Sequence, residues 1–355
     1  MRTLFAGTGS YVPQMVTNEE LFNLFHEATS GTRPVQKNGT LIGSDWPERY
    51  FGIKSRCLDL TDNAMTDTDL AVKAAQIALK DSGVSSSQIG VIIHITPTPD
   101  KVHFQNHFAD LMQRLNLATD VHALYMDLGC CALGPALQEV RAHLHLEPDT
   151  FVLLISSQCV SPLIRNNERL LSYLNHSTEP FAWLTTGTVF SDGAAAVVCK
   201  QVDDREKRGV LRTWTGCNPS GVIITYENDF YIMNGAFVKK NFIPTMQGLY
   251  ERMLKEWDTY VYPVVEKPFS SLLVKRWYFH QANGNIIKET ADLLKIPVDR
   301  IPLLITREGN SSAVSTLRLL DKDRRDGTVQ EGDLVVFFWT GAGNGAQFGY
   351  SVVII

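Results

Sequence analysis

The sequence has little of what membrane, secreted and metal-binding proteins need. No run of about eighteen uninterrupted apolar residues occurs, and the start lacks the basic segment, apolar stretch and small-residue cleavage site of a secretory leader. The six cysteines form no CxxC pair and no dense framework, which disfavours a disulfide scaffold or a structural zinc site. We therefore expect a cytoplasmic protein with free thiols, no membrane segment and no metal.

An excess of basic residues is also missing. Lys and Arg number 33 against 38 Asp and Glu, and the formal net charge of -5 makes nucleic acid an unfavourable partner. A dinucleotide loop is excluded as well, because in "GTGSYV" Val12 stands where the third glycine of GxGxxG is needed, and no acidic residue follows a second strand at the expected interval. No redox cofactor is therefore implied.

What is present is the pattern of a layered α/β protein. Short apolar runs at 3–9, 89–96, 151–157 and 193–199 predict strands, and 67–83 predicts a helix with an Asp at its start and a Gly after its end. The second half repeats the scheme, with a strand end at 277–281, an amphipathic helix at 283–296 and a strand, glycine turn and strand at 332–355. At 355 residues the chain predicts two similar halves, 1–205 and 206–355, around a charged, solvated loop at 200–210.

The stretch "MDLGCCALGP" raises the question of chemistry. We interpret 121–129 as a buried strand, Gly129 as a tight turn, and the following segment as a helix whose first turn holds Cys130 and Cys131. The helix amino end favours a thiolate, so either cysteine could be a nucleophile. Inert packing is the alternative, because free cysteine behaves as a small hydrophobe.

Two further motifs supply partners for a thiolate. His280 ends an apolar run before a polar turn, as a histidine that holds or relays the proton of a nucleophile would. Asn310 stands in a small-residue turn before a helix. Taken alone, His280 also suits a buried structural histidine, and Asn310 suits a helix cap.

Together these motifs resemble β-ketoacyl-acyl carrier protein synthase III and the wider thiolase-fold condensing enzymes. The matching segments, in the family's order, are "GTGSYVPQMVTNEEL" from residue 7, "FSDGAAAVV" from 190, "FHQANGNII" from 279 and "REGNSSAVS" from 307. The resemblance implies a five-layered α-β-α-β-α fold built from two similar halves, and a homodimer, the family's usual assembly. It covers about residues 3 to 350.

The resemblance further implies that Cys130, His280 and Asn310 form the triad of a decarboxylating Claisen condensation. Cys130 would take an acyl group from a thioester, and His280 and Asn310 would donate hydrogen bonds to the enolate oxygen formed from a malonyl-type extender. The glycine before Cys130 and the spacing to the following helix favour Cys130 over Cys131, whose role we do not derive. A second oxyanion hole would use the backbone N–H of Cys130 and one from Gly343 or Asn344, unless "GAGNGAQFG" is an ordinary hairpin turn.

Substrate contacts are implied at four positions. Trp46 and Arg49, in "SDWPERYFG", match a tryptophan and a displaced arginine that grip coenzyme A, although Tyr50 stands at the arginine position and Trp46 also suits a structural aromatic. Asn283 belongs to the HQAN motif. Phe104 matches a phenylalanine that reaches into the partner's acyl tunnel, or is a core residue. Acyl-CoA, acyl carrier protein or both are the implied partners.

Several functions share these features. The preferred one is an acyltransferase of the ketosynthase III type, in fatty acid or specialised polyketide biosynthesis. The alternatives are acyl transfer from the cysteine to an oxygen or nitrogen nucleophile, the joining of two β-ketoacyl chains into a pyrone-type ring, and a non-catalytic subunit of a heterodimer. Acyl transfer is disfavoured because relatives of that kind tend to lose the asparagine that this chain retains at 310.

Overall fold

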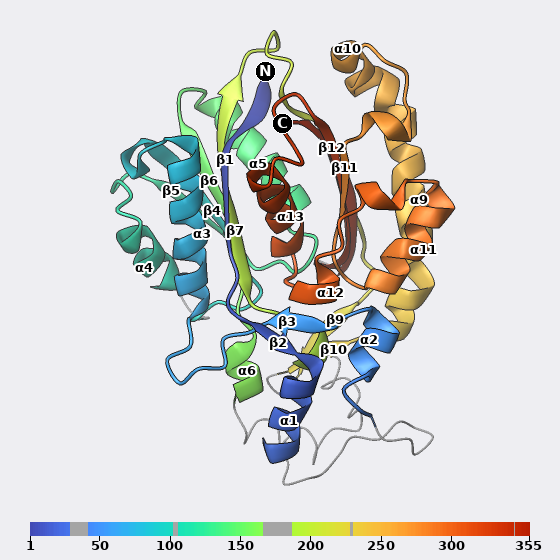
Figure 1. The fold of residues 1–355 in the computed structure, drawn as a ribbon. Helices are drawn as coiled ribbons and strands as arrows, with labels where there is room; N and C mark the ends of the chain where they lie inside the picture. Colours follow the sequence, from blue (N-terminus) through green and yellow to red (C-terminus); the bar gives the residue numbers. More distant parts are fainter. Residues whose placement is uncertain (29–41, 102–105, 166–186, 228–229, 344) are drawn as a thin grey trace.

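The computed structural model describes residues 1–28, 42–101, 106–165, 187–227, 230–343 and 345–355. Two sheets lie face to face, with helices between them and on both outer faces (Figure 1). No helix among the described residues is both long enough and apolar enough to cross a lipid bilayer.

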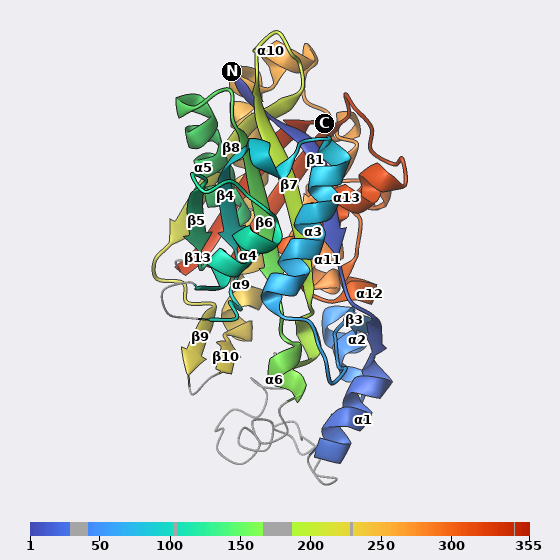
Figure 2. The ribbon, with the colours of Figure 1, turned by 90° about the vertical axis from the view of Figure 1, so that its left-hand side faces the viewer.

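The first sheet has five strands in the order β1-β7-β6-β4-β5. Their bounds are β1 Arg2–Tyr11, β4 Ile89–Ile95, β5 His122–Met126, β6 Phe151–Gln158 and β7 Gly193–Val202. Helices α3 (Asp67–Ser82) and α4 (Asn106–Arg114) cover its outer face, as Figure 2 shows. Leu70, Ala74 and Ala78 of α3 are buried against Ile92 and Leu153 of the sheet, which gives this face its own apolar core.

The second sheet has four strands in the order β11-β12-β13-β8. Their bounds are β8 Gly209–Asn218, β11 Arg276–Phe279, β12 Leu334–Gly343 and β13 Gly345–Ile354. Helices α9 (Gly235–Tyr260) and α11 (Gly284–Leu294) cover its outer face. Met253 and Trp257 of α9 and Ile287 of α11 are buried against Trp277 and Phe338 of the sheet.

Between the sheets lie α5 (Leu133–Leu146) and α13 (Val314–Arg325). Their apolar faces, including Val140 and Leu317, are buried together with Val152 of the first sheet and Val335 and Phe337 of the second. Helix, sheet, helix, sheet and helix layers therefore follow one another. This confirms the five-layered α/β fold expected from the sequence.

The two sheets repeat one topology. In the first, β1 pairs antiparallel with β7, β7 antiparallel with β6, and β6 parallel with β4. In the second, β8 pairs antiparallel with β13, β13 antiparallel with β12, and β12 parallel with β11. The first sheet only adds β5, parallel to β4, at its edge. The two similar halves are thus present in strand order and direction.

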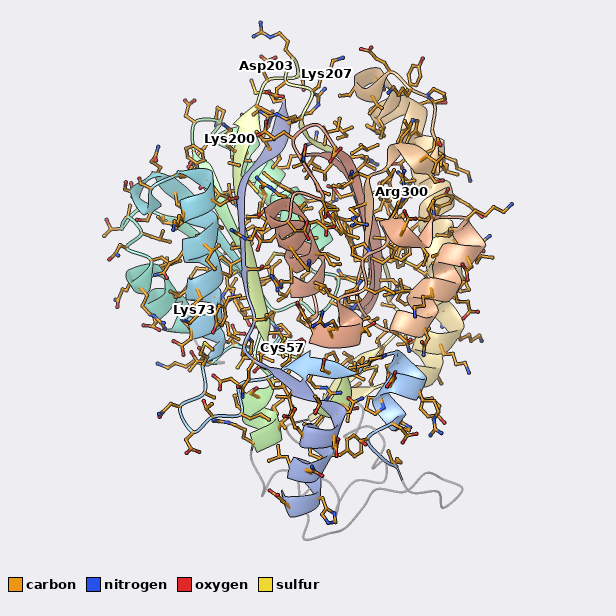
Figure 3. The ribbon with its side chains drawn as sticks, viewed as in Figure 1. Cys57, Lys73, Lys200, Asp203, Lys207 and Arg300 are labelled. Atoms are coloured by element: carbon orange, nitrogen blue, oxygen red, sulfur yellow. The ribbon has the colours of Figure 1, made fainter. Side chains whose placement is uncertain are left out.

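The chain passes from the first sheet to the second between Val202 and Gly209, where the proposed boundary at 205 lies. Asp203 and Lys207 stand in this turn at the outer end of the molecule (Figure 3). Both are exposed, as a charged solvated loop requires.

Helix α3 shows why the local sequence folds as it does. Thr66 precedes it and accepts a hydrogen bond from the Asp69 backbone N–H, while the Asp69 side chain accepts one from the Thr66 backbone, forming a capping box. Gly83 ends the helix at φ +69°, a left-handed conformation that glycine adopts without strain. The helix therefore starts at Asp67 and is followed by Gly83, as expected from the sequence, and its cap is the preceding Thr66.

Shorter elements gather beyond the carboxyl ends of the central strands (Figure 1). They are β2 Met15–Thr17, α1 Asn18–Ala28, α2 Trp46–Phe51, β3 Ser55–Cys57, α6 Ser161–Arg165, β9 Ile224–Glu227, β10 Phe230–Met233 and α12 Ile305–Glu308. At the opposite end lies α10, Tyr262–Val265. Single 3-10 turns occur at Ser86–Gln88, Ser271–Leu273 and Val298–Arg300.

One strand differs from its predicted environment. The segment 121–129 was expected to be buried, but β5 is an edge strand whose His122 and Ala123 are exposed and whose Leu124, Tyr125 and Met126 are half-buried. The apolar residues of 123–126 do not by themselves distinguish an edge strand from a central strand. Only the position of β5 at the open edge of the sheet makes the difference.

Candidate active site

Three segments that are distant in sequence meet at one cavity of about 480 Å³. Cys130 comes from the turn between β5 and α5, His280 from the end of β11, and Asn310 from the turn after α12. All three side chains are more than nine-tenths buried. The fold thus brings together the three residues that the sequence singled out, and their catalytic roles remain predictions.

Cys130 lies just before the amino end of α5. The helix begins at Leu133, so the two thiols lie in the turn that precedes it. The expectation that they occupy the first turn of the helix is therefore wrong. The turn is closed by the Ala132 N–H donating to the Gly129 carbonyl at 3.1 Å. A Cβ on Gly129 would lie 3.0 Å from the Ala342 carbonyl oxygen, so a glycine lets this turn approach the β12–β13 hairpin.

Cys131 points away from the cavity. Its side chain is fully buried among the residues between the sheets, and its Sγ donates to the Gln347 carbonyl at 3.1 Å. Burial raises the pKa of its thiol well above the ordinary value, with smaller contributions from Cys130 and Cys217. Cys131 therefore has the surroundings of a structural thiol, and of the two adjacent cysteines only Cys130 lines the cavity.

His280 is held by backbone and side-chain bonds on one side. Its N–H donates to the Phe338 carbonyl at 2.8 Å, and its Nδ1 lies 3.3 Å from the Ser315 Oγ. Its Nε2 has no hydrogen-bond partner within the described part of the chain. Burial lowers the pKa of His280 to about 4, so the imidazole is neutral at physiological pH.

The Ser315 hydroxyl can support either neutral form of His280. It donates to the Ser312 carbonyl at 2.8 Å, and in that orientation its oxygen accepts the hydrogen of Nδ1 and leaves Nε2 as an acceptor. If the hydroxyl turns toward Nδ1, the hydrogen of the ring resides on Nε2. Nε2 can therefore accept a proton from the cavity or donate a hydrogen bond into it.

Asn310 is fixed so that its amide nitrogen is the free end. Its Oδ1 accepts from the Ser312 backbone N–H at 2.9 Å, and its own N–H donates to the Val189 carbonyl at 2.9 Å. Its carbonyl accepts from the Ser191 N–H and from the Gln158 side chain. With the oxygen occupied, Nδ2 is the part of the side chain left to donate into the cavity.

The β12–β13 hairpin supplies backbone groups beside Cys130. The Cys131 N–H donates to the Ala342 carbonyl at 3.3 Å, and the backbone N–H groups of Ala342 and of Cys130 itself favour the Cys130 thiolate. A Cβ on Gly341 would lie 2.8 Å from the Cys130 Cβ. Thr340, Gly341 and Ala342 therefore form the wall behind the sulfur.

The second oxyanion hole expected at Gly343 or Asn344 remains a prediction, and the structure does not place Gly343 beside Cys130. Gly343 pairs with Gly345 at the hairpin tip and does not line the cavity, and Ala342 is the residue whose N–H faces Cys130. Asn344 and Phe104 lie outside the described residues. The cluster of glycines in the sequence pointed to the tip of the hairpin. The pairing register of β12 and β13, which the sequence does not give, determines which backbone N–H faces the sulfur.

Trp46 and Arg49 occupy different sides of α2. Trp46 lines the cavity and packs on Tyr50 and Phe51, with ring centroids 5.4 and 5.2 Å apart. Arg49 does not line the cavity: it lies 5.1 Å above the Tyr50 ring and pairs with Asp45 at 3.8 Å. Tyr50, at the position expected for arginine, is the residue of this pair that reaches the cavity.

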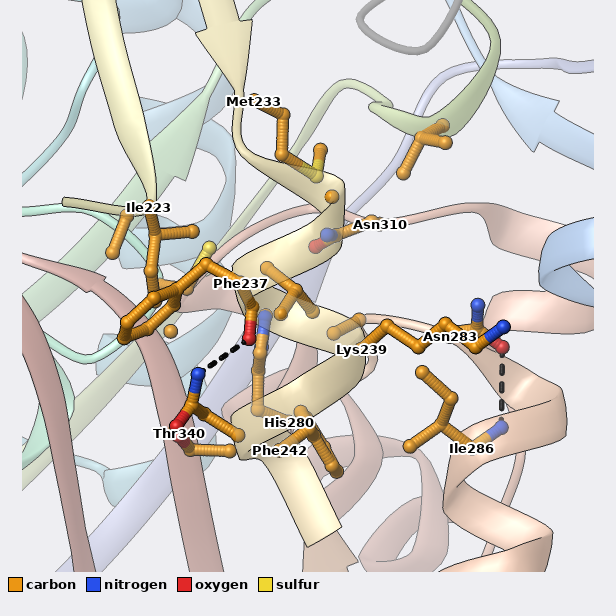
Figure 4. A pocket seen from close by; sticks show the side chains of 18 of the residues that line it. Ile223, Met233, Phe237, Lys239, Phe242, His280, Asn283, Ile286, Asn310 and Thr340 are labelled. Atoms are coloured by element: carbon orange, nitrogen blue, oxygen red, sulfur yellow. Dashed lines mark hydrogen bonds between the residues drawn. The ribbon is translucent and has the colours of Figure 1, made fainter. Parts of the chain in front are cut away.

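Asn283 also lines the cavity, but its polar side-chain atoms form hydrogen bonds to the backbone of α11 and α2. Its Oδ1 caps α11 by accepting from the N–H groups of Asn285 and Ile286, and its Nδ2 donates to the Tyr50 carbonyl at 3.0 Å. Asn283 therefore joins α11 to α2. Figure 4 shows it at one side of the cavity, with Lys239 of α9 reaching toward it.

The remaining wall was not found from the sequence. It is mainly apolar and comes from α9, α11 and the β8–β10 region, with Ile223, Met233, Phe237, Val238, Phe242 and Ile286. Within the described ranges no group of three His, Cys, Asp or Glu side chains is placed to hold a metal ion. The arrangement can bind an apolar chain and present a buried thiol, an imidazole and an amide to it.

Comparisons with known proteins agree with this geometry. The family model for the C-terminal part of 3-oxoacyl-(acyl-carrier-protein) synthase III matches residues 270–354. A β-ketoacyl-(acyl-carrier-protein) synthase III of Bacillus cereus is 27% identical over 340 residues, which cover 95% of this chain and 94% of that relative. The matched C-terminal region contains both His280 and Asn310.

Solved structures share the whole fold. The 3-oxoacyl-(acyl-carrier-protein) synthase III of Aquifex aeolicus superposes with a TM-score of 0.76 at 24% identity, covering 99% of this chain and 100% of that one. The Xanthomonas campestris protein OleA superposes with a TM-score of 0.82 at 16% identity, covering 100% of this chain and 99% of that one. These likenesses concern the arrangement of the chain.

Proposed function

We propose that this chain, a β-ketoacyl-acyl carrier protein synthase III-like protein of the thiolase fold, joins two acyl units by decarboxylative Claisen condensation. The observation that carries the proposal is the convergence of Cys130, His280 and Asn310 on one cavity, with only Cys130 of the adjacent cysteines reaching it. An acyl-thioester transferase needs such a nucleophile beside neutral hydrogen-bond donors.

The first half-reaction loads Cys130. The Cys130 proton passes to the His280 Nε2, and the thiolate attacks the thioester carbonyl carbon. The backbone N–H groups of Cys130 and Ala342 stabilise the oxyanion. The carrier thiolate then leaves, the C–S bond to Cys130 remains, and the departing sulfur takes the proton back from His280.

The second half-reaction forms the carbon–carbon bond. A malonyl-type thioester loses carbon dioxide, and the electron pair becomes an enolate whose oxygen accepts hydrogen bonds from Asn310 Nδ2 and from the Nε2–H form of His280. The enolate carbon attacks the acyl carbonyl on Cys130. Collapse of that adduct expels the Cys130 thiolate and releases a β-ketoacyl product, and the thiolate takes a proton from water to restore the thiol.

One side of the cavity supports a pantetheine thioester as the donor. The cavity is lined there by Trp46, Asn283 and the exposed cation Lys239, and Lys239 reaches toward Asn283 (Figure 4). We propose that Lys239 faces the phosphate of coenzyme A or of an acyl carrier protein, with Arg49 adding positive charge from outside. Lys239→Glu should raise KM about tenfold with little change in kcat, whereas Lys288→Glu, on an exposed residue outside the cavity wall, should not. Equal KM values for the two variants would contradict this contact.

A second copy of this chain is the proposed partner of β5. Among the described strands β5 is the edge strand of the first sheet, and its Leu124 and Met126 are only half-buried. Antiparallel pairing of β5 with its own copy about a two-fold axis would join the two five-stranded sheets. Light scattering should give a dimer mass, and Ala123→Pro should convert it to monomer; a monomeric wild-type chain would refute the pairing.

One experiment tests the reaction itself. The protein is incubated with acyl-CoA and acyl-carrier thioesters and weighed intact, beside Cys130→Ala and Cys131→Ala. We expect an acyl adduct that only Cys130→Ala loses. Labelled malonyl thioester should then release carbon dioxide and yield a β-ketoacyl product.

Other outcomes identify the alternatives. Acyl transfer to an alcohol or amine without carbon dioxide release would replace condensation by simple acyl transfer. A product containing two long β-ketoacyl chains would indicate chain joining. No adduct on any cysteine would indicate a non-catalytic subunit.

A further inference from the structure

Ser312 contacts Asn310 and Cys130 of the proposed triad directly, and it is linked to His280 through Ser315. Its backbone N–H donates to the Asn310 Oδ1, and its carbonyl accepts from Ser315, whose oxygen faces the His280 Nδ1. Its hydroxyl donates to the Cys130 Sγ at 3.6 Å.

The backbone of Ser312 is held in an unusual conformation. Its φ of +57° lies in the left-handed region, which is strained for a residue with a Cβ and is adopted routinely only by glycine. The side chain is 2% exposed, so the hydroxyl faces the protein interior. A serine kept here, rather than the glycine that the backbone would favour, indicates a use for its hydroxyl.

Within the described residues, the groups that favour the Cys130 thiolate in the resting site are hydrogen-bond donors and not cations. Burial is the largest influence on the pKa of Cys130 and raises it, and the three groups that lower it are the Ser312 hydroxyl and the backbone N–H groups of Ala342 and Cys130. His280 is neutral because its pKa is lowered to about 4. Before any proton moves to His280, the groups that favour a thiolate at this position are therefore neutral donors, and Ser312 supplies the side chain among them.

We propose that Ser312 is a fourth catalytic residue, whose hydroxyl donates a hydrogen bond to the Cys130 thiolate each time that thiolate forms. The inference rests on the proposed function. When the thiol gives up its proton, the hydroxyl stabilises the negative sulfur. Acylation removes that charge, since a thioester sulfur is a weak acceptor, and the bond strengthens again when the β-keto product departs and Cys130 leaves as thiolate.

The direct test measures the reactivity of Cys130 without any condensation. The rate of iodoacetamide alkylation is followed against pH by mass spectrometry of the Cys130 peptide in wild type, Ser312→Ala and Ser312→Gly. We expect both variants to raise the apparent pKa of Cys130 by about one unit, which is a roughly tenfold lower rate at a fixed pH below that pKa. Ser311→Ala is the matched control: of these two adjacent serines, Ser312 is the one whose hydroxyl donates to the Cys130 Sγ, so the Ser311 variant should leave the profile unchanged.

Two variants separate the hydroxyl from the backbone. Alanine keeps the Cβ at positive φ, and glycine relieves it, so a hydroxyl effect must be the same in both. A shift in only one of them, or wild-type profiles in both, would overturn the proposal. If Ser312→Ala does not fold, the glycine variant, which suits this φ, decides alone.

A second measurement divides the two half-reactions. Ser312→Ala keeps the backbone N–H that orients Asn310, so decarboxylation of malonyl thioester without an acyl donor should proceed at the wild-type rate, while acylation of Cys130 slows about tenfold. An equal loss of the decarboxylation rate and the acylation rate would indicate a general structural role for Ser312 and refute the proposed role of its hydroxyl. If the wild-type protein performs no condensation, the proposed function is refuted. The alkylation experiment still tests, independently, whether the Ser312 hydroxyl stabilises the Cys130 thiolate.

Discussion

Gly341 gives the sharpest test of the position of the nucleophile. It has an ordinary negative or extended φ, so only space opposes a side chain there. A Cβ at this position would lie 2.8 Å from the Cys130 Cβ, whereas ordinary contacts begin at 3.4 Å. Gly341→Ala must therefore push Cys130 and the hairpin apart by about 0.6 Å, because the carbons on both sides belong to backbone-anchored groups.

This displacement should affect chemistry more than stability. A misplacement of about 1 Å at a reacting atom costs roughly a hundredfold, so we expect acylation of Cys130 to slow by about 10- to 100-fold. Overpacking of this size costs about 1–3 kcal/mol of unfolding free energy. Single-turnover acylation measured by intact mass, together with a denaturant melt, separates the two effects.

Gly248→Ala is the matched control for Gly341→Ala. Gly248 lies inside α9, and a Cβ there meets nothing within 4 Å. Replacing a helical glycine by alanine should raise the free energy of unfolding by about 0.5–1 kcal/mol and leave acylation unchanged. Acylation of Gly341→Ala at the wild-type rate would show that the hairpin does not confine Cys130.

Three further predictions follow from single contacts. Cys131→Ala should keep the acyl label on Cys130 and lose about 1 kcal/mol of stability, checked by mass spectrometry and a denaturant melt, because only packing and the bond to Gln347 disappear. Thr66→Ala removes the cap of α3 and should cost about 1 kcal/mol without changing acylation. The pKa of His280 is about 4 in the folded protein and 6.5 in the unfolded chain, so the unfolded state binds more protons between these pH values. The contribution of His280 to the free energy of unfolding should therefore be fully present above pH 6.5 and be lost as the pH falls toward 4. His280→Gln should lack that part of the slope, and an identical slope would place the titration elsewhere.

Much of the fold could be predicted because the local signals agree with the global one. The continuous apolar runs at 89–96 and 151–157 are typical of parallel strands covered on both faces, and they became β4 and β6. Helix α9 was missed, since Pro244 inside it and Gly248 further along hide the helical pattern. Helix α9 is stabilised by packing on the second sheet, and the local sequence pattern gives no information on that packing.

The site was predictable to the level of motifs. Residues 280 and 310 were found from the segments around them, and the choice of Cys130 over Cys131 followed from spacing. Sequence could not show that the Cys131 thiol turns to β13, nor that the register of the hairpin places Ala342 rather than Gly343 beside the sulfur. Both depend on how strands pair across the molecule.

The neutrality of the centre has a consequence for the proposed reaction. Before carbon dioxide leaves, the negative charge of a malonyl group rests on its carboxylate, and afterwards it rests on the enolate oxygen. A permanent cation beside the carboxylate would stabilise the starting state and slow the step. Around the triad the wall is mainly apolar, with Phe237 and Phe242, and His280 is uncharged. In the proposed reaction the donors of Asn310 and His280 therefore act where charge develops, which is the condition for accelerating decarboxylation.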